Sequence, residues 1–193
     1  MTCDIVLAGV GGQGVLSIAA IIAGAAMADG LKVRQSEVHG MAQRGGAVSA
    51  HLRISDRPIH CDLIASGGAD LILSMEPVES LRYLSFLKPE GAIVTAAEAF
   101  VNIPDYPELG QITAAILRQP RSRVIAAAEL ARKAGSARAV NMVIVGAASP
   151  FIPVDRASIE ASIARLFGAK DATLVETNLK AFAAGRAAGA ADK

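Results

Sequence analysis

The stretch Gly9-Val10-Gly11-Gly12-Gln13-Gly14 decides the fold of this chain, because it separates an apolar run from a small, apolar helix. Residues 4–8 have the continuous apolar character of a buried strand, and residues 15–28 follow with a helical pattern. A glycine turn between a strand and a helix brings backbone N–H groups to the positive end of the helix dipole. An anionic group such as a phosphate can bind there, although such glycines can also serve only close helix–strand packing.

A second glycine-containing stretch, Ser36-Glu37-Val38-His39-Gly40-Met41-Ala42-Gln43-Arg44-Gly45-Gly46, predicts a long polar loop that opens at Glu37. Arg44 suits bidentate contact with a phosphate or carboxylate, or an ion pair between subunits. The Gly45-Gly46 pair allows the backbone to approach a ligand or a partner chain. His39 could move a proton as a catalytic group, and it could equally be a hydrogen-bonded histidine of an interface.

Strands and helices alternate along the first 135 residues, and only helices follow. The expected strands are 4–8, 31–35, 47–54, 70–75, 92–95 and 124–127, the expected helices are 15–28, 76–87, 111–118, 128–134, 139–148, 156–167 and 175–188, and 88–91 is expected to be a turn. This order predicts an α/β fold, a Rossmann-like and mostly parallel sheet with helices on both faces. We expect one domain, 1–193, with a sheet core over 1–135 and a helical C-terminal part over 136–193. Ligands of such sheets bind beyond the carboxyl ends of the strands, so the two glycine loops should meet.

The composition limits the kind of protein. Apolar residues make up 52% of the 193 residues and aromatic residues only 4%, so the core must consist mainly of Ala, Val, Ile and Leu, with close helix packing. A formal net charge of +1 gives no argument for a nucleic-acid or membrane partner. Residues 5–27 carry no charge, but glycines interrupt this run and no basic segment precedes it, unlike a signal peptide. We therefore expect a soluble, cytoplasmic protein.

The two cysteines, Cys3 and Cys61, lie far apart, with neither a Cys-x-x-Cys motif nor a Cys/His cluster of metal-binding spacing. We expect no metal ion and no iron–sulfur cluster in this chain. Both residues are expected to be buried free thiols, which suit a reducing compartment.

The sequence contains no Gly-x-Ser-x-Gly, Walker A or His-Glu-x-x-His motif, and no Gly-Asp-Gly thiamine diphosphate motif. A dinucleotide site requires an acidic residue about 20 positions after the glycine turn, and Glu37 satisfies this spacing. A self-sufficient nicotinamide-dependent enzyme that relies on Glu37 is therefore one alternative. A ligand-type loop without a catalytic constellation is more typical of one part of a larger enzyme.

Several segments closely resemble the gamma domain of the 2-oxoacid:ferredoxin oxidoreductases. They are Gly9-Val10-Gly11-Gly12-Gln13-Gly14-Val15, Gln43-Arg44-Gly45-Gly46, Ala50-His51-Leu52-Arg53-Ile54, and the later residues 87–91, 141–146 and 176–185. The resemblance extends over essentially the whole chain. Within the family, residues 36–46 look most like the indolepyruvate-specific members.

The resemblance implies a large alpha subunit that carries thiamine diphosphate and [4Fe-4S] clusters, and ferredoxin or another electron acceptor. The assembled enzyme would oxidatively decarboxylate an arylpyruvate and transfer the acyl group to coenzyme A. This chain, inactive alone, would help to bind coenzyme A and complete the active site. On the family pattern, the coenzyme A region would include Gly9, Gly11, Gly12, Gln13 and Gly14, and the same cleft or the alpha-subunit contact would include His39, Gln43, Arg44, Gly45 and Gly46.

Two further expectations accompany this resemblance. Asn141 would order the start of a helix behind the cleft. A purely structural subunit, whose glycine loops only pack, remains an alternative. In that case substitution of Gly12 or Arg44 would disturb assembly without changing the KM for coenzyme A.

Overall fold

The computed structural model describes residues 1–39, 45–101, 103–168 and 171–190. Its strands are β1 (Thr2–Val10), β2 (Lys32–His39), β3 (Ala47–Ser55), β4 (Ala69–Ser74), β5 (Leu87–Ala96) and β6 (Arg121–Ile125). Its α-helices are α1 (Val15–Ala28), α2 (Pro77–Arg82), α3 (Leu109–Leu117), α4 (Ala127–Lys133), α5 (Val140–Ala148), α6 (Arg156–Gly168) and α7 (Ala172–Ala190). Short 3-10 turns are η1 (Leu84–Phe86), η2 (Ala137–Ala139) and η3 (Ser149–Phe151).

The strands form one six-stranded sheet in the order β2-β3-β1-β4-β5-β6. β1, β4, β5 and β6 pair in parallel, while β3 is antiparallel to both of its neighbours, β1 and β2. The mostly parallel α/β fold predicted from the sequence is therefore confirmed. The reversed direction of β3 follows from its short connection to β2, because a parallel neighbour needs a crossover of a dozen or more residues.

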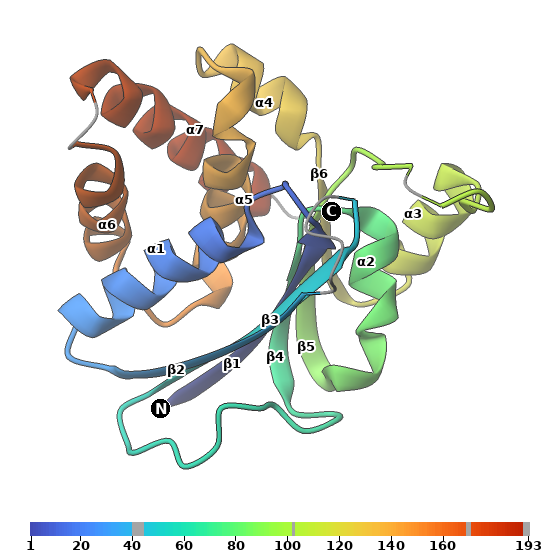
Figure 1. Cartoon of the computed structure of the whole chain (residues 1–193), viewed down its shortest axis with the longest axis horizontal. Coiled ribbons are helices and arrows are strands. Elements are labelled where there is room, and N and C mark those ends of the chain that lie inside the picture. The colour runs from blue at the N-terminus through green and yellow to red at the C-terminus, as the bar shows by residue number, and fades with distance from the viewer. Residues whose placement is uncertain (40–44, 102, 169–170, 191–193) are drawn as a thin grey trace.

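Helices cover both faces of the sheet (Figure 1). On one face, α1, α5, α6 and α7 enclose a core that includes Leu7, Leu52 and Phe182. On the other face, a smaller core under α2 and α3 includes Val6 and Ile72. Leu7 and Val6 are adjacent in β1 and point to opposite faces, which explains why the strand is apolar throughout. Within the described part of the chain, no helix is long and apolar enough to cross a membrane.

The C-terminal helices α5 and α7 pack with their backbones almost in contact. A Cβ atom added at Gly146 would lie 2.0 Å from the Phe182 carbonyl oxygen, and one added at Gly189 would lie 2.2 Å from that of Ala147. A side chain is therefore excluded at both of these glycine positions. The close packing expected from the Ala- and Gly-rich composition is found here.

Some element boundaries differ from the sequence-based expectations. β2 continues to His39 instead of ending at residue 35, because it pairs with β3 along its whole length. The helix expected over 76–87 ends at Arg82, since Leu87 already pairs with Ala69 in the sheet. Residues 88–91, expected as a turn, lie within β5, where the register shifts between the pairs Ala69–Leu87 and Leu71–Ala92. β6 covers 121–125 rather than 124–127.

The two cysteines have different environments. Cys3 is buried in β1, where burial, followed by the charges of Asp70 and Asp4, raises the pKa of its thiol to about 12. Cys61 is exposed, so the expectation that both thiols are buried was wrong for this residue. It follows β3 in an irregular segment, whose surface position a hydropathy pattern does not reveal.

Candidate functional site

The two glycine loops meet at the carboxyl end of β1, as the topology predicted. The amide of Gly11 donates to the carbonyl oxygen of Gly46 at 2.7 Å, and the amide of Gly45 donates to that of Gly11 at 3.2 Å. These bonds continue the β1–β3 pairing, whose last pair is Val10 with Ala47. The loop before β3 is thus fastened directly to the turn before α1.

The turn itself requires glycine at two positions. Gly12 has φ +102° and Gly14 has φ +78°, a backbone region that favours glycine. Gly14 is the N-cap of α1 and provides no side chain to cap the helix. α1 also has no acidic residue in its first turn, so the positive end of its dipole is not compensated by its own side chains.

Four backbone amides at this helix end have no acceptor among the described residues. In the described part of the chain, the N–H groups of Gly12, Gly14, Val15 and Leu16 have no hydrogen-bond acceptor. They border a pocket of about 330 Å³. Its lining combines glycine backbone with aliphatic side chains: Val10, Gly11, Gly12, Gly14, Val15, Leu16 and Val48. This combination suits a ligand that has both an anionic group and an apolar portion.

Two of the residues assigned to this site from the sequence are engaged inside the protein. Gln13 Oε1 accepts from the Val10 amide at 2.8 Å, and Gln13 Nε2 donates to the Met75 carbonyl oxygen at 3.2 Å. A Cβ atom at Gly9 would lie 2.8 Å from Val15 Cγ2. Gln13 thus links the turn to the residue after β4 by hydrogen bonds. Gly9 allows β1 and α1 to lie close to each other.

The structure describes only some of the other residues assigned to the site. Gln43 and Arg44 lie outside the described residues. The backbone of His39 ends β2, whereas its side chain is outside the described part. Gly45 and Gly46 lie at the turn, as described above.

Glu37 does not have the position that a dinucleotide site requires. It lies within β2, opposite Ala50, so the expectation that it opens a loop was wrong. β3 separates β2 from β1 and its glycine turn, which places the two strands about 10 Å apart. In dinucleotide-binding folds the acidic residue ends the strand next to the glycine turn.

A buried carboxylate, that of Glu76 after β4, was not found from the sequence. Glu76 is 1% exposed and caps α2 by accepting from the Glu79 amide at 2.9 Å. It also accepts from the Phe100 amide at 3.3 Å and from the Tyr106 hydroxyl group. Burial, followed by the bond to Glu76, raises the pKa of Tyr106. Glu76 therefore fastens the segment between β5 and α3; the only sequence signal is an acidic residue directly before Pro77 at a helix start.

The polar face of β3 is structural. Arg53 makes a bidentate ion pair with Asp4, with Nε–Oδ1 and Nη2–Oδ2 distances of 2.8 and 3.0 Å. His51 Nδ1 accepts from the Ile64 amide at 2.8 Å. Burial, followed by the nearby charge of Arg53, lowers the pKa of His51. Both side chains are therefore engaged in contacts within the protein.

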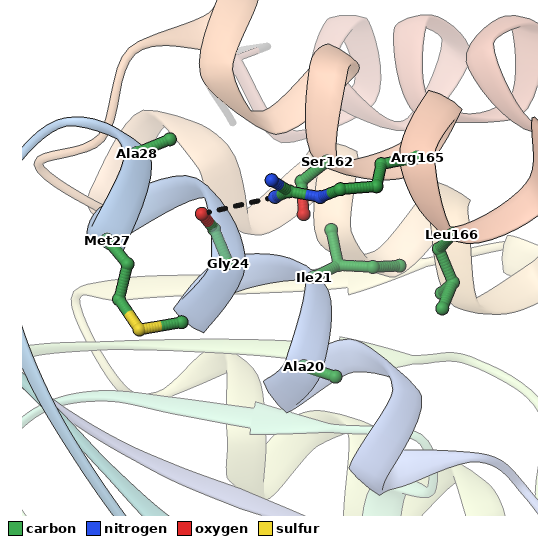
Figure 2. A pocket seen from close by; sticks show the side chains of 8 residues that line it. All are labelled: Ala20, Ile21, Gly24, Met27, Ala28, Ser162, Arg165 and Leu166. Carbon is green, nitrogen blue, oxygen red and sulfur yellow. Dashed lines mark hydrogen bonds between the residues drawn. The ribbon is translucent and has the colours of Figure 1, made fainter.

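A larger cavity lies elsewhere, between α1 and α6 (Figure 2). It measures about 560 Å³ and is bordered mainly by aliphatic side chains such as Ile21, Met27 and Leu166. The guanidinium group of Arg165 crosses it and donates to the Gly24 carbonyl oxygen at 3.4 Å. Gly24 is ten residues beyond Gly14, about 15 Å along the helix. The smaller glycine pocket is the better candidate, because it is lined by residues whose amides have no acceptor among the described residues.

Comparisons with known proteins agree with the predicted family. Residues 4–188 match the family model described as pyruvate ferredoxin/flavodoxin oxidoreductase. The indolepyruvate oxidoreductase subunit IorB of Archaeoglobus fulgidus is 39% identical, covering 96% of this chain and 94% of the relative. The same subunit of Pyrococcus horikoshii is 37% identical, covering 93% and 92%.

Solved structures share the fold. The 2-oxoglutarate:ferredoxin oxidoreductase from Magnetococcus marinus, with 2-oxoglutarate, coenzyme A and succinyl-CoA bound, superposes with a TM-score of 0.78 at 24% identity. The match covers 100% of this chain and 32% of that one. The gamma subunit of a keto/oxoacid ferredoxin oxidoreductase from Geobacter sulfurreducens has a TM-score of 0.70 at 24% identity, covering 97% and 98%. The family model and these relatives show that this chain belongs to the pyruvate ferredoxin/flavodoxin oxidoreductase family and is similar over nearly its whole length to indolepyruvate oxidoreductase subunits IorB.

Proposed function

We propose that this chain is the small subunit of an arylpyruvate:ferredoxin oxidoreductase of the indolepyruvate type. The assembled enzyme converts an aryl 2-oxoacid to the aryl-acetyl-CoA and CO2 and passes the electrons to ferredoxin. The names and near-complete coverage of the relatives support the subunit role and the substrate class. The reaction requires a large partner subunit, because no thiamine diphosphate motif and no cluster of cysteines occurs in this sequence.

The observation that carries the proposed role is the meeting of the two glycine loops around the uncapped end of α1. Coenzyme A has anionic phosphates and a pantetheine arm. The free amides of Gly12, Gly14, Val15 and Leu16 suit a phosphate, and the aliphatic lining of the 330 Å³ pocket suits the arm. Bound coenzyme A supplies the thiol that accepts the acyl group. The residues of this chain hold and orient it.

The second part of the proposed role concerns the polar residues that precede β3. Gly45 and Gly46 are hydrogen-bonded to Gly11, which lines the pocket. We place Gln43, Arg44 and His39 around the same cleft or against the large subunit. His39 would be the one side chain of this group able to transfer a proton near neutral pH.

Two structural features support the remaining expectations. The hydrogen bond from Asn141, in the helical C-terminal part, to Gly14, in the sheet core, supports treating residues 1–193 as one domain. Both cysteines are free thiols, which suits the cytoplasm.

The test is a reconstitution with a candidate large subunit that carries thiamine diphosphate and iron–sulfur clusters. Coenzyme A-dependent reduction of a viologen dye is measured with indolepyruvate, phenylpyruvate, pyruvate and 2-oxoglutarate. We expect activity only with both chains and only with the aryl substrates. Failure to associate or to reduce dye, together with tight NADH binding by this chain alone, would establish the nicotinamide alternative instead.

A further inference from the structure

A residue of another helix donates a hydrogen bond to the N-terminal end of α1. Asn141 lies in the first turn of α5, and its Nδ2 donates to the Gly14 carbonyl oxygen at 3.1 Å. The same oxygen accepts from the amides of Ser17 at 3.0 Å and Ile18 at 3.3 Å. One carbonyl group thus receives two donors from its own helix and one from a residue 127 positions away.

The fit between Asn141 and Gly14 is close. A Cβ atom added at Gly14 would lie 2.3 Å from Asn141 Nδ2, so the amide group occupies the space that a side chain would need. α5 is a firm support for this contact, because the residues that follow Asn141, including Met142, Val143 and Ile144, are fully buried in the core. Movement of the Gly14 peptide group would therefore have to break a fixed hydrogen bond.

The orientation of this carbonyl group determines the direction of an amide in the pocket. The C=O of Gly14 and the N–H of Val15 belong to one planar peptide group and point in opposite directions. The carbonyl points along α1 toward Asn141, so the Val15 N–H points out of the helix end, where the pocket lies. A single donor on α5 thus fixes an amide on the ligand side.

We propose that Asn141 is a positioning residue for the coenzyme A site. By holding the Gly14 carbonyl group it aims the Val15 amide, together with the adjacent free amides of Gly14 and Leu16, at the anionic group of the ligand. Gln13 fixes the other end of the same turn through Val10 and Met75. This inference rests on the proposed function, since it names the residue that keeps the proposed site in its binding geometry.

The test uses the assembled complex and the substitution Asn141→Asp. Aspartate has nearly the same shape, but its carboxylate cannot donate and repels the Gly14 carbonyl oxygen. We expect the KM for coenzyme A to rise about tenfold, as for loss of one hydrogen bond, with kcat almost unchanged. Lowering the pH should partly restore the KM, because a protonated carboxyl group can again donate.

Asn178 provides a matched control. It is an asparagine on a C-terminal helix, buried where Asn141 is half-buried, and its Nδ2 donates to the Leu174 carbonyl oxygen of the same helix at 2.7 Å. Asn178→Asp should alter stability without changing the KM for coenzyme A. An equal rise in KM in both variants would show a general structural effect and overturn the positioning role.

Amide hydrogen exchange of the peptide covering residues 11–17 separates the two proposals. In the wild-type complex, coenzyme A should slow exchange there, and in Asn141→Asp it should protect less. If coenzyme A does not protect this peptide in the wild type, the proposed coenzyme A site is wrong, and the role of Asn141 falls with it. If coenzyme A protects both proteins equally, the site stands and only the role of Asn141 is refuted.

Discussion

Gly185 of α7 packs directly on the backbone of Val143 in α5: a Cβ atom added at Gly185 would lie 1.9 Å from the Val143 carbonyl oxygen. The two helices can adopt this spacing only because glycine occupies the contact. The same seam positions α5, whose first turn carries Asn141. A packing contact remote from the pocket therefore supports the geometry of the glycine turn.

Gly185→Ala should lower the free energy of unfolding by about 3 kcal/mol, because the added methyl group must separate two backbones. Denaturant unfolding monitored by circular dichroism measures the change. Gly110 in α3 is the matched control, since in the part of the chain that the structure describes nothing lies within 4 Å of its Cβ position. Gly110→Ala should raise stability by about 0.5–1 kcal/mol, the ordinary helix propensity difference. Equal effects of the two substitutions would contradict the tight seam.

Gly12→Ala tests the ligand role of the turn. No atom of the described residues lies within 4 Å of its Cβ position, so the added methyl group would enter the pocket beside the amides that lack an acceptor. We expect the KM for coenzyme A to rise at least tenfold in the reconstituted complex, measured with saturating 2-oxoacid.

The control for this variant is Gly30→Ala, at the opposite end of α1. Gly30 has φ +78°, and its Cβ position is also open, so it bears a comparable backbone strain without a ligand. It should lose stability but keep its KM. If Gly12→Ala changes assembly and stability alone, the structural-subunit alternative is correct.

Arg53→Ala should cost about 3 kcal/mol of stability, because it leaves the buried carboxylate of Asp4 without its bidentate partner. Thermal or urea unfolding measures this loss. The double variant Asp4→Ala, Arg53→Ala should be more stable than Arg53→Ala alone, since no unpaired charge remains. A double variant that is less stable than the single one would show that Arg53 acts mainly through other contacts, such as its bonds to the carbonyl groups of Cys61 and Leu63.

The folded protein should lose stability in mild acid because of His51. Its pKa in the folded protein is lowered from 6.5, first by burial and then by Arg53, so the folded state prefers the neutral ring. This contribution to stability is present above pH 6.5 and is lost as the pH falls through the lower folded-state pKa. Protonation would also turn Nδ1 into a donor, so it could no longer accept the hydrogen bond from the Ile64 amide.

His51→Asn is the comparison for this pH dependence, because its Oδ1 can accept the same bond without titrating in this range. The wild type should lose more stability than this variant between pH 7.5 and pH 5.5, a range chosen to span the ordinary histidine pKa of about 6.5. Unfolding curves at several pH values give the difference, in which the other titrating groups cancel. Parallel curves for the two proteins would exclude His51 as the cause.

Much of the sheet could be predicted from the sequence. The apolar run before Gly9 and the helical pattern after Gly14 determine the first strand, turn and helix, because burial on both faces requires apolar residues at every position of β1. The direction of β3 could have been deduced from the short connection after His39, which permits only a hairpin. The extension of β2 through Glu37 could not have been deduced. Its polar side chains do not indicate a strand, and only the backbone pairing with β3 makes this segment one.

The parts of the site that depend on contacts between distant residues were harder to predict from the sequence. Gln13 was assigned to a ligand from its place in a motif, and only the fold brings Met75 within reach of its amide. Glu76 could be recognised as a helix cap before Pro77, but Tyr106 contacts it across 30 positions. Such pairs leave no periodic signal, since each depends on how strands are ordered and not on local spacing.

The sequence by itself determined the fold class and the two glycine loops, because hydrophobic period and turn chemistry are local properties. The family followed from the resemblance of its motifs. The sequence also placed both loops at carboxyl ends of strands, from which their meeting follows. Only the tertiary structure decided which amides remain free and which residue holds them. The bond between Asn141 and Gly14 forms because α5 packs against the sheet core, and long-range packing of this kind depends on the whole folded chain.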